Sequence, residues 1–179
     1  MFAQSRTRRF EQVVLPHLDA AYNLARWLTR DDQDAQDVVQ DAYLRALKYF
    51  GEFRGDDARG WLLAIVRNSF YNWLKERAPQ ALTEAFDEQL HSGQDEAADA
   101  AGNDPAEALA RGDNRRVFNQ ALEALPPEFR EILVLRELED LSYKEIAAII
   151  DAPLGTVMSR LARARKRLWE SVQQMFQEV

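Results

Sequence analysis

The sequence of 179 residues contains no cysteine and only two histidines, His17 and His91. A chain without cysteine has no disulfide, no thiol catalysis and no thiolate metal site, and two histidines this far apart disfavour a histidine metal site. No apolar run approaches the roughly 18 residues that a membrane-spanning helix needs. The basic start, residues 1–9, has no apolar stretch of the signal-peptide type. We therefore expect a cytoplasmic protein with no membrane insertion, no bound metal and no cofactor.

Positive charge is scarce over the whole chain, but the deficit is local. The formal net charge is −7, from 23 lysines and arginines against 30 aspartates and glutamates. Residues 1–79 carry a net charge of +1, residues 80–112 carry −7 and residues 113–179 carry −1. The middle segment is poor in large apolar residues, so it cannot offset the entropy cost of ordering. This pattern predicts two small folded domains joined by a flexible acidic linker.

Both folded parts are expected to be all-α, because apolar residues recur at three- or four-residue spacing and no stretch alternates with period two. In the first part we expect a short arm followed by three helices. The residues that indicate their starts are Pro16, then Asp31 or Asp32, then Asp56 or Asp57. In the second part, one short helix ends near Leu125, Pro127 opens the next, and two more follow up to about Phe176.

Residues 142–168 have the pattern of a helix-turn-helix. Ser142 and Glu145 form a capping box, in which each side chain satisfies a free backbone N–H at the start of a helix. Val157 and Leu161 lie one turn apart and can dock the second helix onto the first. The sequence therefore predicts a short helix that closely crosses the helix following it.

The outward face of the second helix has the composition of a DNA-reading helix. Between Leu154 and Trp169 there are five basic residues and no acidic one. Cations suit phosphates, and short or mobile side chains near the helix start suit base edges in the major groove. The alternative is a solvated basic face at the end of a helix. We favour DNA binding because the capping box and the turn accompany the charge.

Aromatic residues gather between residues 49 and 73, interleaved with arginines, lysines and asparagines. Such a mixture can stack and hold unpaired bases. The alternative is that most of these rings are core residues, because they recur at helical spacing, and spacing alone favours the core.

Acidic residues recur every three or four positions between residues 31 and 45, beside Val38 and Leu44. The segment could dock on a partner helix, although a solvated face with local ion pairs is the simpler interpretation. No histidine, glycine loop or catalytic arrangement of hydroxyl groups accompanies these acids, so they are not a catalytic pair and an enzyme is not expected.

Three stretches, together with the acidic linker between the second and the third, resemble the extracytoplasmic-function (ECF, group IV) sigma factors of bacterial RNA polymerase. They are DAQDVVQDAYLRAL at 34–47, FRGDDARGWLLAIVRNSFYNWL at 53–74, and ALEALPPEFREILVLRELEDLSYKEIAAIIDAPLGTVMSRLARARKRL at 121–168. The resemblance implies sigma region 2 at residues 8–78, an acidic flexible linker at 79–112, region 4 with the helix-turn-helix at 113–170, and a C-terminal helix end at 171–179.

The resemblance also implies roles for particular residues. The residues expected to dock on the largest polymerase subunit are Asp37, Val38, Gln40, Asp41, Leu44 and Arg45. Those expected to bind the minus-ten element are Phe53, Arg54, Arg59, Trp61, Arg67, Asn68, Tyr71, Asn72 and Lys75. Those expected at the minus-thirty-five element are Thr156, Met158, Ser159, Arg160, Ala162, Arg163, Arg165 and Lys166. Some relatives carry other residue types at Met158, Ala162 and Asn72, so base preference there is not inherited.

The function implied by the resemblance is that of an alternative sigma factor. It would bind core RNA polymerase and direct promoter recognition, strand opening and transcription initiation, in a stress or envelope-signal response under an anti-sigma factor. The free chain would be a monomer. Two other readings are a stand-alone helix-turn-helix regulator, which would need a dimer, and a decoy that sequesters an anti-sigma factor. The five cations of the last helix argue against the decoy, because a decoy has no need of them.

Overall fold

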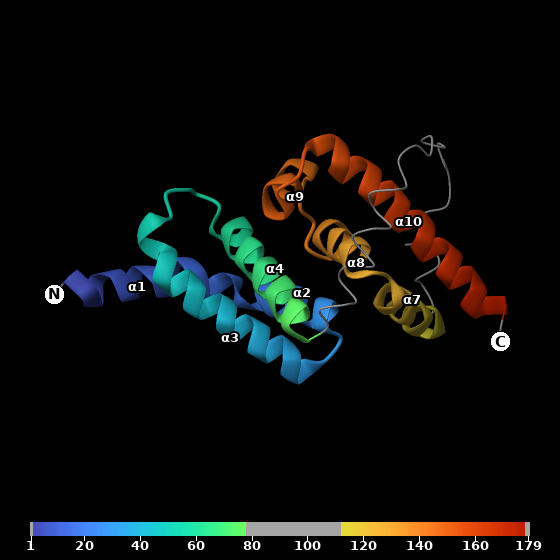
Figure 1. Ribbon diagram of the computed structural model, residues 1–179, viewed down its shortest axis with the longest axis horizontal. Coiled ribbons are helices and arrows are strands. Elements are labelled where there is room, and N and C mark those ends of the chain that lie inside the picture. The colour runs from blue at the N-terminus through green and yellow to red at the C-terminus, as the bar shows by residue number, and fades with distance from the viewer. Residues whose placement is uncertain (1, 78–111, 178–179) are drawn as a thin grey trace.

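A computed structural model describes residues 2–77 and 112–177, and both ranges are helical with short connections. The first range forms an N-terminal bundle and the second a C-terminal bundle, which lie side by side along the long axis (Figure 1). The all-α prediction is therefore confirmed. The predicted acidic linker, residues 79–112, lies outside the described residues except for its last position.

The N-terminal bundle consists of four α-helices with two short 3₁₀ turns. Its elements are α1 (Phe2–Val14), η1 (Leu15–His17), α2 (Leu18–Thr29), α3 (Asp32–Tyr49), η2 (Phe50–Glu52) and α4 (Ala58–Arg77). Helices α2, α3 and α4 pack on one another. Apolar residues at helical spacing, such as Ala35, Val38 and Ala42 of α3, form the buried faces.

Aspartate caps set the two helix starts that the sequence predicts. Asp31 is the N-cap of α3 and accepts a hydrogen bond from the backbone N–H of Asp34 at 2.9 Å. Asp57 accepts from the N–H of Gly60 at 2.8 Å at the start of α4. A Cβ on residue 60 would overlap the carboxylate of Asp57. A larger residue at this position would therefore displace the carboxylate from the cap.

The C-terminal bundle contains the predicted helix-turn-helix. Its elements are α7 (Gly112–Ala124), α8 (Pro127–Leu133), a π-helical turn η3 (Val134–Leu138), α9 (Tyr143–Ile150) and α10 (Leu154–Gln177). Pro127 opens α8 as predicted, and the capping box of Ser142 and Glu145 is present at the start of α9. Asp151 ends α9 in the left-handed conformation.

One local prediction is wrong, and one element was not predicted. The segment before Pro16 is helix α1 and not a short arm, because Phe10 and Val14 are buried against the bundle. The ring of Phe10 meets those of Tyr43 and Phe50 edge to face, with centroids 5.2 and 5.3 Å apart. The π-helical turn after α8 was not predicted either, since a single extra residue in a helix leaves the apolar spacing almost unchanged.

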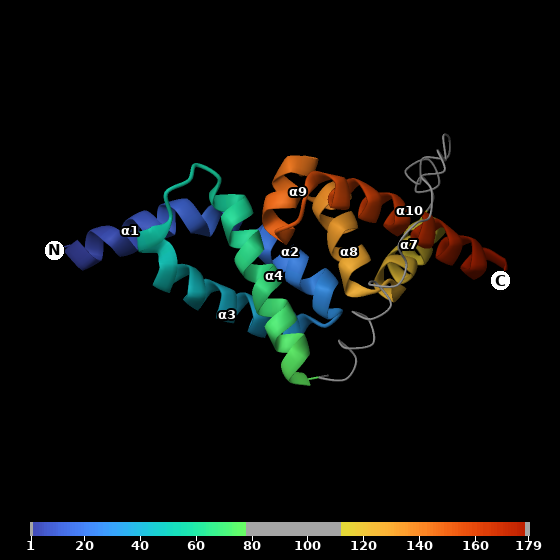
Figure 2. The same cartoon turned by 45° about the horizontal axis from the view of Figure 1, so that its top comes forward.

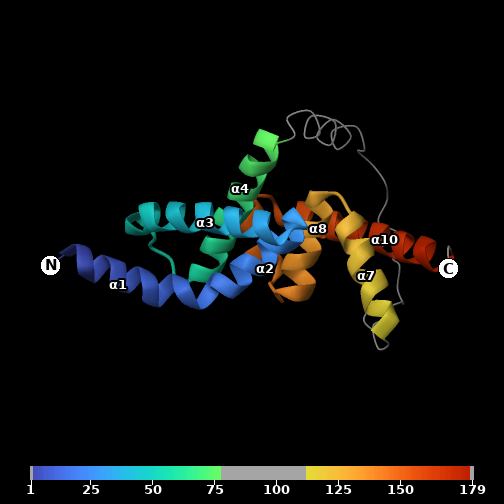
Figure 3. The same ribbon diagram turned by 90° about the horizontal axis from the view of Figure 1, so that it is seen from below.

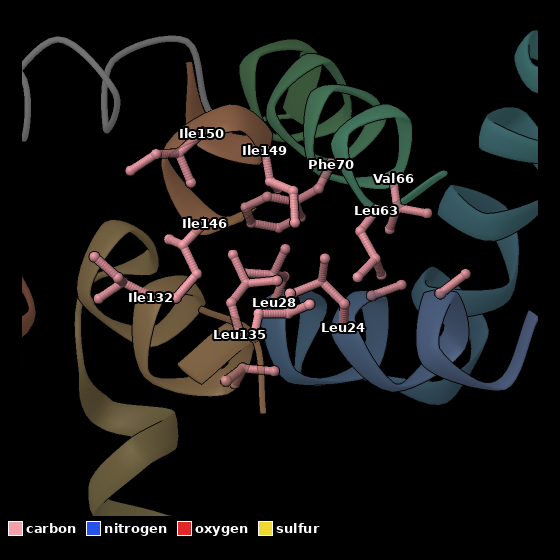
Figure 4. Close-up of a cluster of buried hydrophobic side chains, with 14 of the residues drawn as sticks. Leu24, Leu28, Leu63, Val66, Phe70, Ile132, Leu135, Ile146, Ile149 and Ile150 are labelled. Atoms are coloured by element: carbon pink, nitrogen blue, oxygen red, sulfur yellow. The ribbon is translucent and has the colours of Figure 1, made fainter. Parts of the chain in front are cut away.

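One hydrophobic core runs through both bundles. Helix α4 packs on α9, and α2 packs on α8 and η3. Figures 2 and 3 show α2 and α4 on the side of the N-terminal bundle that meets the C-terminal bundle. The close-up of Figure 4 shows side chains from the four helices meeting at this junction. The residues labelled there are Leu24, Leu28, Leu63, Val66, Phe70, Ile132, Leu135, Ile146, Ile149 and Ile150.

The capping box yields a stability prediction. Ser142→Ala removes the acceptor of the Glu145 N–H, so the free energy of unfolding should fall by about 1 kcal/mol in urea titrations at pH 7. Ser171→Ala, in the interior of α10, is the matched control and should change little.

Hydrogen bonds to Ser142 lower the pKa of Glu145. This contribution is present above the usual pKa of 4.5 and is lost as the pH falls, so the cost of Glu145→Ala should shrink in acid. An equal loss in both serine variants would contradict the prediction.

Candidate nucleic-acid interface

Helix α10 presents a basic face to solvent. Its inner stripe, Val157, Leu161, Ala164 and Leu168, is buried. The residues predicted to read bases or phosphates lie on the opposite side. Those that are exposed are Met158, Ser159, Ala162, Arg163, Arg165 and Lys166, and those that are half-buried are Thr156 and Arg160. The arrangement leaves the helix-turn-helix free to enter a major groove.

Arg165 of this face is paired with an acid of the same bundle. Arg165 donates to the carboxylate of Glu137 in η3 at 2.6 Å, with both side chains nearly half exposed. Such an exposed pair is weak and screened by salt. Arg165 is therefore positioned by Glu137 and can exchange it for a phosphate at small cost.

The aromatic cluster divides into core rings and rings at the surface. Phe50 and Phe70 are buried, as the core interpretation predicts. Phe53 and Trp61 are half-buried beside the loop between η2 and α4, with ring centroids 4.9 Å apart. Arg54 of this loop is exposed. The loop thus combines two partly accessible rings with a cation.

The polar face of α4 carries the remaining residues predicted for the minus-ten element. Asn68, Asn72 and Lys75 are exposed along it. Arg67 and Tyr71 lie one turn apart and are half-buried, with the guanidinium 4.7 Å from the ring centroid. The stripe of Arg67 and Tyr71 therefore faces the C-terminal bundle, whereas the neighbouring stripe of Asn68, Asn72 and Lys75 is open.

Two arginines predicted to contact DNA are bound by acids of the C-terminal bundle. Arg67 contacts Glu131 through two hydrogen bonds, of 2.8 and 3.2 Å. Arg59 donates to Glu139 at 2.7 Å. Burial raises the pKa of Glu131, against the pull of Arg67. Burial alone would lower the pKa of Arg67, but the carboxylate of Glu131 outweighs it and the pKa is raised.

Arg130 is a buried cation that the sequence interpretation missed. From α8 it donates to the backbone carbonyls of Trp27 and Leu28 at the end of α2, at 2.9 and 3.0 Å, and to that of Leu125 at 2.9 Å. A cation at a helix C-terminus also complements the helix dipole. Burial and the nearby charge of Arg30 lower the pKa of Arg130 to about 10, so it stays charged at neutral pH.

The sequence analysis also missed Glu131, although its position in the sequence offered a signal. Glu131 lies three and four residues before Val134 and Leu135, both buried, and is itself fully buried. A charged residue on the buried side of a helix indicates a partner brought from elsewhere in the fold.

The face of α3 predicted to bind polymerase is mostly solvent-exposed. The exposed residues are Asp37, Gln40, Asp41, Leu44 and Arg45. Leu44 is 57% exposed, which is high for an apolar residue in a helix. Asp41 and Arg45 form an ion pair of 2.8 Å, as the alternative of a solvated face predicts. Val38 is a correction: it is 1% exposed, so its side chain belongs to the core and cannot meet a partner.

The comparisons with known proteins agree with this arrangement. The family model for Sigma-70 region 2 matches residues 13–79, and that for Sigma-70, region 4 matches residues 115–168. The chain is 34% identical to the RNA polymerase sigma-H factor of Pseudomonas aeruginosa over 175 residues, covering 96% of this chain and 90% of that one. It is 38% identical to the ECF RNA polymerase sigma-E factor of Escherichia coli K12, covering 78% and 74%.

Two solved structures share the fold. One is the sigma factor RpoE in complex with the anti-sigma factor NepR from Bartonella quintana, with a TM-score of 0.67, 29% identity and coverage of 93% and 98%. The other is CnrH in complex with the cytosolic domain of CnrY, with a TM-score of 0.63, 25% identity and coverage of 96% and 94%. The chain belongs to the sigma-70 family, and within it to the ECF sigma factors.

Two further observations concern the described residues alone. No helix within residues 2–77 and 112–177 is long and apolar enough to cross a membrane. Within the same ranges, no group of three or more His, Cys, Asp or Glu side chains could hold a metal ion.

Arg130 yields a testable prediction. Arg130→Met keeps the apolar stem but leaves the three carbonyl oxygens without their donor, so the free energy of unfolding should fall by about 3 kcal/mol. Arg116→Met, at an exposed position of α7, is the control and should lie within about 0.5 kcal/mol of the wild type. Thermal and urea unfolding followed by circular dichroism measure both. If the two variants unfold alike, Arg130 does not hold the junction.

Proposed function

We propose that this ECF sigma factor binds core RNA polymerase through α3 and reads a promoter with both bundles. The observation that carries the proposal is the segregation of exposed chemistry. An apolar and acidic face lies on α3, a ring-and-amide face on the loop and α4, and a basic face on α10. Each face suits a different ligand, namely a partner helix, unpaired bases and duplex DNA.

In the C-terminal bundle, the proposed minus-thirty-five contacts use α10. Met158, Ser159, Ala162 and Arg163 would face bases, because they are exposed near the start of the helix. Arg160, Arg165 and Lys166 would lie near phosphates, and Thr156 would contact a phosphate from the first turn of the helix.

In the N-terminal bundle, the proposed minus-ten contacts use the loop of residues 53–59 and the face of α4. A base turned out of the stack would enter the loop beside Phe53 and Trp61. The single strand would follow Asn68, Asn72 and Lys75, and its phosphates would bind Arg59 and Arg67. Binding the unpaired strand better than the duplex shifts the promoter toward its open state.

The domain limits and the cellular context also belong to the proposal. We assign region 2 to residues 8–78, the connecting segment to 79–112 and region 4 to 113–170, with the helix end at 171–179. The protein acts in the cytoplasm, where polymerase and promoters are, and catalyses no reaction itself. The NepR and CnrY complexes of its structural relatives support control by an anti-sigma factor. A stand-alone regulator is disfavoured, since both sigma regions match.

Reconstituted transcription tests the proposal. The purified chain is added to core polymerase on a library of randomised promoters, and the initiated transcripts are sequenced. Enrichment of two DNA elements at fixed distances upstream of the start site supports it. Binding to palindromic duplexes without any initiation would indicate a stand-alone regulator instead.

A first prediction from the proposed function concerns the polymerase face of α3. Leu44→Ala removes the most exposed apolar side chain of the proposed polymerase face, so affinity for core polymerase should fall about tenfold, as expected when a small interface loses an apolar anchor. Leu15→Ala, at a leucine 43% exposed in η1, is the control and should retain wild-type affinity. Fluorescence anisotropy measures both. If Leu44→Ala binds core polymerase as tightly as the wild type, this face of α3 is a solvated surface and not a polymerase contact.

The second prediction concerns α10. Arg163→Ala should weaken binding to a minus-thirty-five duplex by about 10- to 100-fold, as the loss of one good base contact does. Its affinity for core polymerase should not change. Arg116→Ala, an exposed arginine of the same bundle on α7, is the matched control. Equal loss of duplex and polymerase binding by Arg163→Ala would mean that it supports the fold and does not read DNA.

A further inference from the structure

The junction between the bundles occupies residues that the proposed function assigns to DNA. Of the residues proposed for the minus-ten element, Arg59 and Arg67 are the two held by carboxylates of the other bundle. These pairs join positions 80 and 64 residues apart in the sequence. They are therefore long-range contacts that join the two bundles, and not local ion pairs within one helix.

The geometry at Arg67 is that of an oxyanion site. Nε and one Nη of the guanidinium each face a different oxygen of Glu131, and the Arg67 and Glu131 side chains are only 19% and 1% exposed. Guanidinium binds carboxylate and phosphate with this same two-point arrangement. A strand phosphate and Glu131 therefore compete for one guanidinium.

Glu139 is held in the same manner at Arg59. Its carboxylate accepts from Arg59 at 2.7 Å and from Asn23 Nδ2 at 2.6 Å, and its backbone carbonyl also accepts from Arg59. The Glu139 side chain is 10% exposed. Contacts from α2 and α4 thus converge on a single glutamate that follows η3.

Apolar packing and Arg130 reinforce these ion pairs. Figure 4 shows Phe70 of α4 among Ile146 and Ile149 of α9. Arg130 joins α8 to the end of α2. The closed arrangement therefore buries apolar surface and charge together, and it covers Tyr71 in addition to the two arginines.

We propose that Glu131 and Glu139 act as an internal mimic of the DNA backbone, so that the closed chain blocks its own minus-ten surface while its basic α10 face stays available. The proposal rests on the proposed function of Arg59 and Arg67. It predicts an asymmetric free protein, which is competent for duplex DNA and blocked for the unpaired strand. Opening of the junction is required before the single strand can bind.

The size of the block follows from the open fraction. When only a fraction of the molecules is competent, the apparent dissociation constant is the intrinsic one divided by that fraction. If about 1% of the free chain is open, single-strand binding is about 100-fold weaker than that of a permanently open variant. Loss of the acids should recover a large part of this factor.

The experiment uses the full chain and its lack of cysteine. Glu11→Cys and Gln174→Cys place one spin label on an exposed site of each bundle, and pulsed electron spin resonance measures their separation. The Glu131→Gln/Glu139→Gln variant should change a single narrow distance into a broad, longer distribution. Its affinity for a fluorescent pool of random single-stranded 15-mers should rise at least about tenfold.

Matched variants separate opening from unfolding and from loss of charge. Glu137→Gln removes an arginine-bound carboxylate of the same bundle, but its partner is Arg165 on α10, so neither distance nor single-strand affinity should change. Glu139→Gln alone changes the less buried of the two carboxylates, so it tests the proposal even if the Glu131 variant misfolds. It should give an intermediate shift in both measurements. Circular dichroism shows whether each variant is folded.

A charge exchange gives an independent test. Glu131→Arg alone sets two cations against each other and should open the junction. Adding Arg67→Glu restores an ion pair and should return the narrow distance, but single-strand binding should stay weak because Arg67 is gone. Failure of the second change to restore closure would argue against the ion pair as its determinant.

The outcomes bear differently on the two proposals. A broad distance distribution in the wild-type chain overturns the internal mimic, whatever the initiation assay shows. Opening of the double variant with no gain in single-strand binding also overturns it. Absence of initiation in a chain whose junction closes normally would instead contradict the proposed function. A narrow wild-type distance, opening on loss of the acids and tighter single-strand binding together support the mimic.

Discussion

The arrangement of the two bundles depends on a fully buried carboxylate. Glu131 lies in α8, where residues 129–133 are all buried, and it has no exposure to solvent. Removing a charge from water costs several kcal/mol, and a buried pair with one partner removed is destabilised by about 3–5 kcal/mol. Arg67 meets this carboxylate at two points. The junction therefore has one favourable register, in which α4 brings its arginine over α8.

Local chemistry could be predicted from the sequence because its causes are a few residues apart. Asp31, Pro127 and the Ser142–Glu145 box fix helix starts through neighbouring backbone groups. The junction could not be predicted, since Arg67 and Glu131 are 64 residues apart and neither position reveals the other. The same reason explains α1, whose Phe10 is ordered by rings more than 30 positions later.

The candidate site shows the same division. The basic face of α10 is predicted by composition, because a helix without acids between residues 154 and 169 must turn its cations to solvent. Val38 is a residue for which the prediction of a polymerase contact is wrong. Its spacing places it in the apolar stripe of α3, and a side chain in that stripe cannot also contact a partner. Its burial decides between the two assignments.

Carboxylate and phosphate are interchangeable ligands for arginine, and this links the junction to DNA. Each bundle alone is close to neutral, so neither attracts DNA through its net charge. Binding must then come from particular cations, and two of those on the N-terminal bundle are neutralised by the C-terminal one. Any ligand that separates the bundles therefore also exposes positive charge on α4. If the unpaired strand binds Arg59 and Arg67 as proposed, separation of the bundles and strand binding are coupled, with each favouring the other.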